Sequence, residues 1–263
     1  MIETHIHDSV VTLSLNRPEK RNALNIELLT QLRAAIQNAA ISSDIRVLVL
    51  KGNGKVFCAG ADLDFLRQLS DEKITSEFAN LLSGLLEDIR TFPVPVLVRV
   101  HGACMGGAIG ILAAADIIIA DVNTPFAFSE VRLGLVPAII SPYVLSKLPL
   151  SKSLDLMLTG RIFSAAEAKD SGLVSFTGDE SEIDFVLKQT ISQIVSSAPS
   201  AVKLTRKMIW DQAINNNWQE YCNQSQELFL KIASSGEAKE GVNAFFEKRV
   251  PSWSNGIIGK MNS

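Results

Sequence analysis

The sequence is poor in the residues that build disulfide frameworks and metal centres. Its 263 residues include only three cysteines and three histidines. Cys58, Cys104 and Cys222 are odd in number and far apart, which argues against a disulfide framework and a zinc-binding spacing. His5 and His7 share the alternation of an expected strand, but a metal site needs three or four ligands and no third is in view. We therefore expect reduced thiols and no metal ion.

Long apolar runs and a strong excess of one charge are also missing. The most apolar run, residues 106–120, is interrupted by Asp116 and is shorter than the roughly 20 residues of a membrane helix. Residues 1–8 have the character of neither a signal peptide nor a transit peptide, so we expect a cytoplasmic protein. The net charge of −3 and the pI near 5.7 give no reason to expect a nucleic acid or a membrane surface as partner.

Apolar residues make up 47% of the chain, enough for one sizeable core. Strand patterns alternate with helical ones between residues 10 and 176, which predicts parallel β–α–β units and an α/β fold. This alternation does not distinguish a doubly wound sheet from a spiral. The expected strands are 10–15, 45–50, 95–100, 117–120 and 126–128. The expected helices begin after the N-cap residue Asn25, within 64–90, at 151 and after the capping residue Ser164.

The last part of the chain has a different pattern. Beyond the predicted hinge at 196–200, helical spacing continues over 201–210, 218–233 and 237–248, and no strand pattern returns. We therefore predict a core domain at 1–197 and a helical domain at 198–263. Trp210, Phe229, Phe245 and Phe246 are more large apolar residues than so small a unit can bury alone, which favours contact between subunits.

Two glycine-rich turns follow two of the expected strands. One is His101–Gly110, with the sequence HGACMGGAIG, and the other is Lys51–Leu63, with the sequence KGNGKVFCAGADL. A single turn of this kind is as often a packing device between helix and sheet as an anion site. Two of them can direct one backbone N–H each, from Ala61 and Gly107, at a single carbonyl oxygen. We therefore predict an oxyanion hole.

Glu130 is the carboxylate best placed to transfer protons. It lies in an otherwise apolar segment, where burial would raise its pKa and suit it to acid–base chemistry. A salt bridge to Arg132 or a helix cap would explain the same residue. A serine hydrolase using Ser129 or Ser141 with His101 is a further alternative, although the chain has no Gly-x-Ser-x-Gly elbow.

Four segments together resemble the enoyl-CoA hydratase/isomerase (crotonase) superfamily. They are NRPEKRNALN at 16–25, FCAGAD at 57–62, HGACMGG at 101–107 and FEKR at 246–249. The resemblance runs in order over nearly the whole chain and implies a right-handed ββα spiral core with a C-terminal helical oligomerisation domain. It also implies an acyl-CoA substrate, no separate cofactor, and a homotrimer or a hexamer built as a dimer of trimers.

The resemblance assigns site residues as well. It implies that Glu130 is catalytic and that the N–H groups of Ala61 and Gly107 form the oxyanion hole. The residues it implies for binding coenzyme A are Lys20, Arg21, Ala23, Ala59, Gly60, Asp62, Leu63, Phe245 and Lys248.

One position departs from the family pattern. Hydratases with two catalytic glutamates carry the second one where this chain has Gly110. The segment 129–143 resembles bacterial enoyl-CoA and methylglutaconyl-CoA hydratases, which tend to have a small residue there, and Ala138 replaces the nucleophilic aspartate of the dehalogenases. We therefore predict an enoyl-CoA hydratase. The alternatives are an isomerase that moves the double bond from position 3 to position 2 with Glu130 alone, and a non-catalytic CoA-binding or RNA-binding member.

Overall fold

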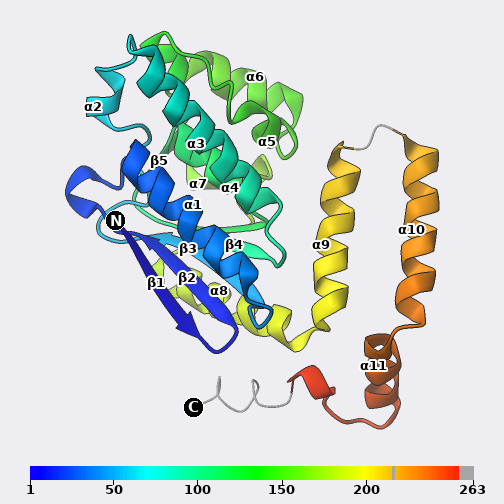
Figure 1. Cartoon of the computed structure of the whole chain (residues 1–263). Coiled ribbons are helices and arrows are strands. Elements are labelled where there is room, and N and C mark those ends of the chain that lie inside the picture. Colours follow the sequence, from blue (N-terminus) through cyan, green and yellow to red (C-terminus); the bar gives the residue numbers. More distant parts are fainter. Residues whose placement is uncertain (215–216, 255–263) are drawn as a thin grey trace. The chain divides into compact units, whose positions relative to one another are not determined.

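The computed structural model describes residues 1–214 and 217–254 (Figure 1). The chain divides into two compact units, Met1–Leu187 and Lys188–Ser263. The division falls inside helix α8, Glu180–Ser196, whereas the predicted boundary at 197/198 lies just after the end of that helix. The predicted hinge is the short connection between α8 and α9, which begins at Pro199.

The first unit is built on a six-stranded sheet with the order β1-β2-β3-β4-β6-β8. All neighbours pair in parallel except β1 and β2, which form an antiparallel hairpin with Asp8 at a positive φ of 52° in its turn. A second sheet pairs β5 with β7 in parallel. The strands are β1 Ile2–His7, β2 Val10–Leu15, β3 Val47–Gly52, β4 Val96–Val100, β5 Cys104–Met105, β6 Ile117–Asp121, β7 Phe126–Ala127 and β8 Phe176–Gly178. The parallel β–α–β units predicted from the sequence are confirmed.

Local sequence signals explain where several helices of this unit begin and end. The side chain of Asn25 accepts a hydrogen bond from Leu28 N–H (2.8 Å), and Ser164 does the same for Glu167 N–H (3.2 Å). Gly160 ends α6 with a left-handed φ of 57°. The helices are η1 Pro18–Lys20, α1 Ile26–Ile41, α2 Leu63–Leu66, α3 Glu72–Arg90, α4 Gly107–Ala114, η2 Glu130–Leu133, α5 Ser141–Leu145, α6 Leu150–Thr159, α7 Ala165–Asp170 and α8.

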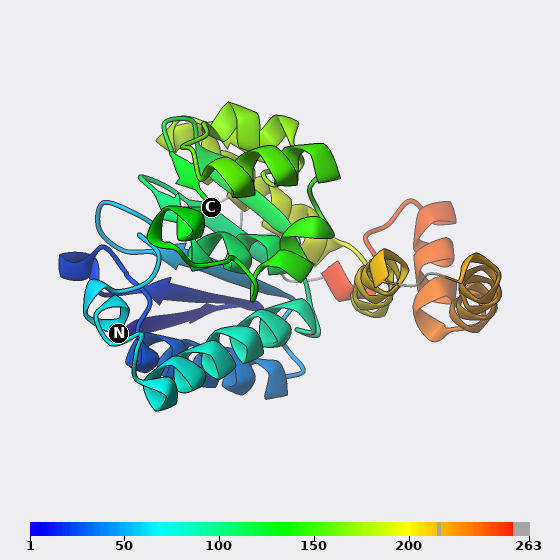
Figure 2. The same ribbon diagram turned by 90° about the horizontal axis from the view of Figure 1, so that it is seen from above.

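Helices α1 and α3 lie side by side against the sheet (Figures 1 and 2). Their apolar faces, with Leu28 and Leu32 on α1 and Leu82 and Leu86 on α3, are buried in one continuous core. All residues of α4 except the first are buried as well. The first turn of α4 is therefore held rigidly by the core while its first residue reaches the surface of a cavity.

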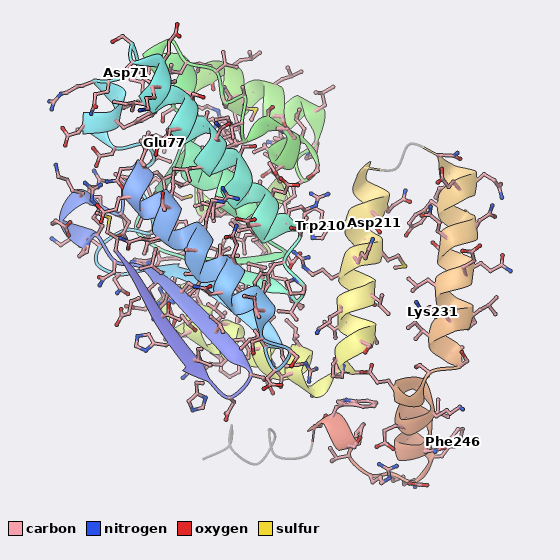
Figure 3. The ribbon with its side chains drawn as sticks, in the orientation of Figure 1. Asp71, Glu77, Trp210, Asp211, Lys231 and Phe246 are labelled. Atoms are coloured by element: carbon pink, nitrogen blue, oxygen red, sulfur yellow. The ribbon has the colours of Figure 1, made fainter. Side chains whose placement is uncertain are left out.

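The second unit contains helices only among its described residues. They are the last part of α8, α9 Pro199–Ile214, α10 Trp218–Ala233, α11 Gly236–Phe246 and η3 Ser252–Ser254. The three helices predicted for this region are confirmed. Trp218, Phe229, Phe245 and Phe246 are each at least 70% exposed, and Figure 3 shows Phe246 projecting from the end of α11.

No helix within residues 1–214 and 217–254 combines the length and the apolar character needed to cross a membrane.

Candidate active site

In the glycine-rich turn Lys51–Leu63, which is called the first turn because it comes first in the chain, the N–H of Ala61 points away from the backbone of Leu24. Leu24 N–H donates to Gly60 O (2.7 Å), and Asp62 N–H donates to Leu24 O (2.9 Å). These two bonds pair Leu24 with Ala61 as in a parallel sheet, so the N–H of Ala61 points to the opposite side. It has no backbone acceptor among the described residues and lies at the wall of a cavity.

The second turn, His101–Gly110, exposes the N–H of Gly107 to the same cavity. Gly106 has φ 52° and ψ −128°, a conformation open to glycine but not to other residues, and its own N–H donates to Ala127 O (2.8 Å). Gly107 is then the first residue of α4, where an N–H has no partner within the helix. Within residues 1–214 and 217–254 no backbone carbonyl accepts from it.

An isolated β-bridge between the backbones of Cys58 and Cys104 joins the two glycine-rich turns. Met105 N–H donates to Cys58 O and Cys58 N–H to Ala103 O, both at 3.2 Å. Both thiols are fully buried and free, and burial raises the pKa of Cys58 to about 12. These cysteines therefore pack the turns as neutral side chains, and each precedes its N–H donor by three residues.

Ala61 and Gly107, which carry the two N–H donors, both line a cavity of about 270 Å³. Its walls come from Leu24, from the segment 61–69, from the first half of α3 and from residues 135–140. Phe65 and Phe78 stack in this wall with ring centroids 3.8 Å apart. Among the described residues that line the cavity, Glu130 is the only ionisable one and Thr75 has the only other polar side chain.

The carboxylate of Glu130 lies beside the second turn. A Cβ atom placed on Gly106 would lie 3.3 Å from Glu130 Oε1 and 3.6 Å from Ser129 Oγ, so both groups flank that glycine. Glu130 Oε2 is buried and has no hydrogen-bond partner among the described residues. Burial raises the pKa of Glu130 above its usual range, against a smaller lowering by a backbone hydrogen bond. An unpaired acid–base group thus shares the cavity with two unpaired N–H donors.

The other interpretations of these residues find less support. Arg132 does not pair with Glu130; its Cγ lies 3.1 Å from the Cβ position of Gly160, at the end of α6. His101 Nε2 is 2.9 Å from Gly54 O, and the hydroxyl of Ser141 donates to Ala138 O, so they form no serine–histidine pair. No group of three or more potential metal ligands occurs within residues 1–214 and 217–254.

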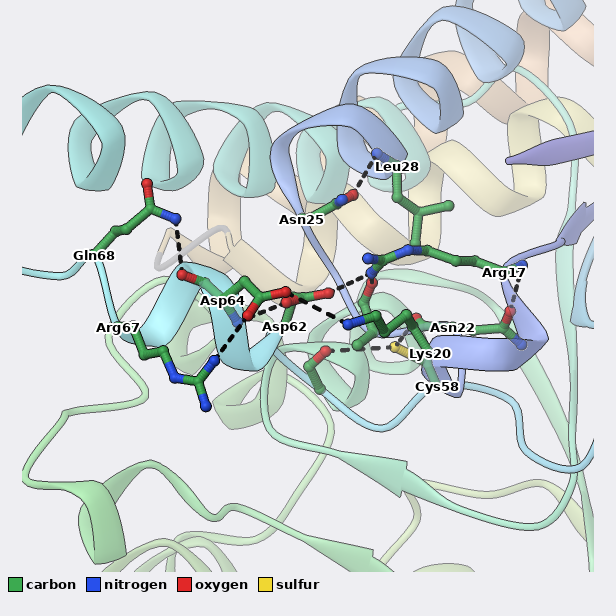
Figure 4. Close-up of polar contacts among 12 residues, drawn as sticks. Arg17, Lys20, Asn22, Asn25, Leu28, Cys58, Asp62, Asp64, Arg67 and Gln68 are labelled. Atoms are coloured by element: carbon green, nitrogen blue, oxygen red, sulfur yellow. Dashed lines mark hydrogen bonds and ion pairs between the residues drawn. The ribbon is translucent and has the colours of Figure 1, made fainter.

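A buried ion pair that was not predicted from the sequence supports the first turn (Figure 4). Arg17 pairs with the carboxylate of Asp62 and also donates to Ala23 O (3.1 Å). The side-chain amide of Asn22 donates to three backbone carbonyls of residues 53–57. Asn22 Oδ1 also accepts from Arg17 N–H (2.8 Å), but the carbonyls that its amide contacts lie more than 30 residues later in the chain, so a local pattern cannot reveal this role.

Asp62 was predicted to bind coenzyme A, and its side chain is already paired within the protein. The residue is 3% exposed, and its carboxylate is occupied by Arg17 and by the N–H of Asp64 (2.7 Å). Burial alone would raise its pKa, but these hydrogen bonds and the charge of Arg17 outweigh burial and hold the pKa below its usual range. The side chain of Asp62 therefore anchors the backbone next to Ala61.

The acid sensitivity of Asp62→Asn tests this anchoring role. A carboxyl group with a lowered folded pKa contributes stability above its unfolded pKa, near 3.9, and loses it as the pH falls through the folded value. At pH 7 the variant should therefore unfold with a free energy lower by roughly 2 kcal/mol or more, and the gap should narrow at the acid end. Denaturant titrations from pH 3 to 7 measure this. Asp64→Asn, at an exposed neighbour, is the control, and equal losses in both variants would contradict the anchoring role.

The remaining predicted CoA residues of the first unit cluster around the same loops. Lys20 and Arg21 are exposed, and Lys20 Nζ is 3.4 Å from an Asp64 carboxylate oxygen. The backbone of Ala23 and Ala59 already makes internal hydrogen bonds: Ala23 N–H donates to Lys20 O and Ala59 N–H to Arg21 O (both 3.0 Å). Gly60 O accepts from Leu24, and Leu63 is 70% exposed. Phe245 and Lys248 belong to the second unit and are exposed.

Known proteins resemble this chain over nearly its full length. The sequence model of the enoyl-CoA hydratase/isomerase family matches residues 5–256. The trans-2-decenoyl-[acyl-carrier-protein] isomerase of Streptococcus mutans is 30% identical, covering 94% of this chain and 95% of that protein. The crystal structure of an enoyl-CoA hydratase from Shewanella pealeana is 31% identical, with a TM-score of 0.90 and coverage of 96% and 95%. An enoyl-CoA hydratase of Mycobacterium smegmatis is 28% identical, with a TM-score of 0.91 and coverage of 97% and 99%. These likenesses confirm the predicted crotonase-like fold.

Proposed function

Since the chain belongs to the enoyl-CoA hydratase/isomerase family and is therefore an enzyme of one of these two kinds, we propose that it adds water across the 2,3 double bond of an enoyl-CoA thioester. The observation that carries this proposal is the unpaired Glu130 Oε2 in the same cavity as the unpaired N–H groups of Ala61 and Gly107.

The proposed mechanism divides the work between these groups. The two N–H groups bind the thioester oxygen and stabilise the negative charge that it gains as an enolate forms. Glu130 takes a proton from water as the water oxygen bonds to carbon 3, and a proton passes from the carboxyl group to carbon 2. The raised pKa of Glu130 supports this double role, because it brings the acid and carboxylate forms closer in free energy near neutral pH.

Isomerisation is the second candidate, and the lining of the cavity favours it. Moving a double bond from position 3 to position 2 takes a proton from carbon 2 and returns one to carbon 4, so a single carboxylate suffices. A second carboxylate at position 110 has no room. A Cβ atom on Gly110 would overlap the Ile140 side chain, lying 3.0 Å from Ile140 Cβ and 3.2 Å from Leu86 Cδ1. Because Ile140 is buried, it cannot easily move aside.

Two thioesters distinguish the candidates. Trans-2-hexenoyl-CoA should lose its conjugated thioester absorbance on hydration, whereas 3-hexenoyl-CoA should gain that absorbance on isomerisation. We expect the faster rate with the 2-enoyl substrate and a 3-hydroxyacyl product by mass spectrometry. If only the 3-enoyl substrate is turned over, isomerisation would replace hydration as the proposed function. If neither substrate is turned over, both candidate functions would be contradicted.

Making room for a second carboxylate should increase hydration. Gly110→Glu alone should overpack the core and lower the free energy of unfolding by about 1–3 kcal/mol. Gly110→Glu combined with Ile140→Ala removes the overlapping side chain, so we expect a higher ratio of hydration to isomerisation than in Ile140→Ala alone. Denaturation and the two absorbance assays measure both effects. Full stability of the single variant would show that Ile140 does not close the position.

We also propose the coenzyme A contacts that the family resemblance implies. Exposed Lys20 and Arg21 supply charge for phosphates, with Ala23, Ala59, Gly60, Asp62 and Leu63 beside the ligand. The proposal needs no cofactor beyond the coenzyme A of the substrate, and the cytoplasmic location stays a prediction. Occupied N–H donors or a paired Glu130 would favour a non-catalytic or RNA-binding member, and neither is found among the described residues.

The exposed apolar side chains of the second unit support assembly into a trimer or a dimer of trimers. Side chains as large as Trp218, Phe229 and Phe245 are at least 70% exposed in the single chain, which is unfavourable unless another surface covers them. We propose that Phe245 and Lys248 contact coenzyme A in that assembly. Light scattering that finds a fully active monomer would contradict it.

Lys248→Ala should weaken binding of an acyl-CoA by about fivefold at low ionic strength, and by less at high salt, because an exposed charge is screened. Turnover at saturating substrate should not change. Isothermal titration at two salt concentrations measures the affinity. Lys239→Ala removes a different exposed lysine, which lies on α11, and is the control. An affinity equal to that of the control at low salt would remove Lys248 from the site.

A further inference from the structure

No cation is found among the described residues that line the cavity beside Glu130. Glu130 is the only ionisable residue among them, and the hydroxyl of Thr75 already donates to Leu69 O (3.0 Å). Two arginines lie close in sequence to residues that line the cavity, but each has other neighbours. Arg67 pairs with Asp64 (3.0 Å), and Arg132 packs its Cγ near Gly160. A carboxylate at the far end of an acyl chain would therefore enter a pocket without a cation.

Such a carboxylate would also meet Glu130. Burial already raises the pKa of Glu130, which means that the cavity disfavours even one negative charge. A second anion would lose its hydration and repel the first. An apolar chain end, by contrast, would contact the aliphatic residues of 135–140 and the stacked rings of Phe65 and Phe78.

The cavity offers about 270 Å³ to such a chain end. The paired phenyl rings are close-packed, with an angle of 15° between their planes, and form a firm wall.

We propose that the enzyme takes neutral, apolar acyl groups and rejects acyl groups that end in a carboxylate. This inference rests on the proposed function in that it assigns the cavity to the acyl group. It departs from the sequence resemblance of 129–143 to methylglutaconyl-CoA hydratases, whose substrate carries such a carboxylate.

The binding experiment compares two saturated thioesters of similar size, hexanoyl-CoA and glutaryl-CoA, by isothermal titration on the full chain. Neither contains the double bond, so binding is measured without turnover. Hexanoyl-CoA should bind at least about tenfold more tightly, because burying an unpaired carboxylate is costly. Equal or tighter binding of glutaryl-CoA would overturn the proposal, and so would no binding of either. In parallel, trans-2-hexenoyl-CoA and glutaconyl-CoA are compared in the absorbance assay. Tight binding of hexanoyl-CoA without turnover of the 2- or 3-hexenoyl thioester would refute the proposed function and leave the acyl preference standing.

A charge added at the cavity should change the preference. Val136 lines the cavity and is 76% exposed, so Val136→Arg can keep its charge hydrated while facing the acyl chain. The ratio of the two affinities should move at least about fivefold towards glutaryl-CoA. Leu133→Arg adds the same charge at an exposed position outside the lining and should leave the ratio unchanged. Equal ratios in the two variants would show that the acyl end does not reach this cavity.

Discussion

Glu130→Gln is expected to reduce turnover by about two to four orders of magnitude while leaving acyl-CoA affinity nearly unchanged. The amide keeps the shape of the side chain but cannot carry a proton. Because Oε2 has no protein partner among the described residues, replacing that oxygen by an amide nitrogen removes no hydrogen bond made by Oε2. Steady-state rates and titration of a saturated acyl-CoA measure the two quantities. Glu77→Gln, on the exposed face of α3 (Figure 3), is the control and should retain full turnover.

Although Glu130→Gln should lower turnover, it should not lower the free energy of unfolding at neutral pH. A carboxyl group whose folded pKa is raised destabilises the folded state as the pH rises from its unfolded pKa, near 4.3, through the folded value. At pH 7, Glu130→Gln should therefore be at least as stable as the native chain, and the difference should vanish under acid conditions. Lower stability at neutral pH would show that the charge of Glu130 is satisfied by a partner. Unchanged turnover would remove Glu130 from the mechanism.

Gly107→Pro is expected to reduce turnover by about a hundredfold to a thousandfold by deleting one oxyanion donor. Proline is well tolerated as the first residue of a helix, which is the position of Gly107 in α4. The added side chain has space, since a Cβ atom there would lie 3.4 Å from Leu82 Cδ2 and 3.5 Å from Leu24 Cδ1. Steady-state rates with trans-2-hexenoyl-CoA and circular dichroism measure activity and folding.

Gly107→Ala is the matched control. It adds the same Cβ atom but keeps the N–H, so it should retain most of the turnover if the donor matters and crowding does not. A folded proline variant with the activity of the alanine variant would contradict the oxyanion assignment. Equal losses in the two variants would point to crowding of the cavity.

Much of the fold could be predicted from local patterns. The alternation in 10–15, the capping residues Asn25 and Ser164, and the helical spacing of 218–233 each depend on residues close together in the chain. Strand boundaries were less accurate. The strand predicted at 45–50 is β3, Val47–Gly52, because pairing with β2 and β4 decides which residues belong to it.

The candidate site shows the same division between local and distant information. Paired glycines and a glutamate in an apolar segment were enough to predict Ala61, Gly107 and Glu130 as candidates, because glycine turns and side-chain chemistry are visible in a short stretch. The role of Asp62 depended on Arg17, which lies 45 residues earlier in the chain. The closure of position 110 by Ile140, and the absence of a cation among the described residues that line the cavity, depended in the same way on separate segments brought together by folding. Desolvation and packing act between neighbours in space, so only the tertiary structure decided which of the carboxylates anchors a turn and which remains unpaired for chemistry.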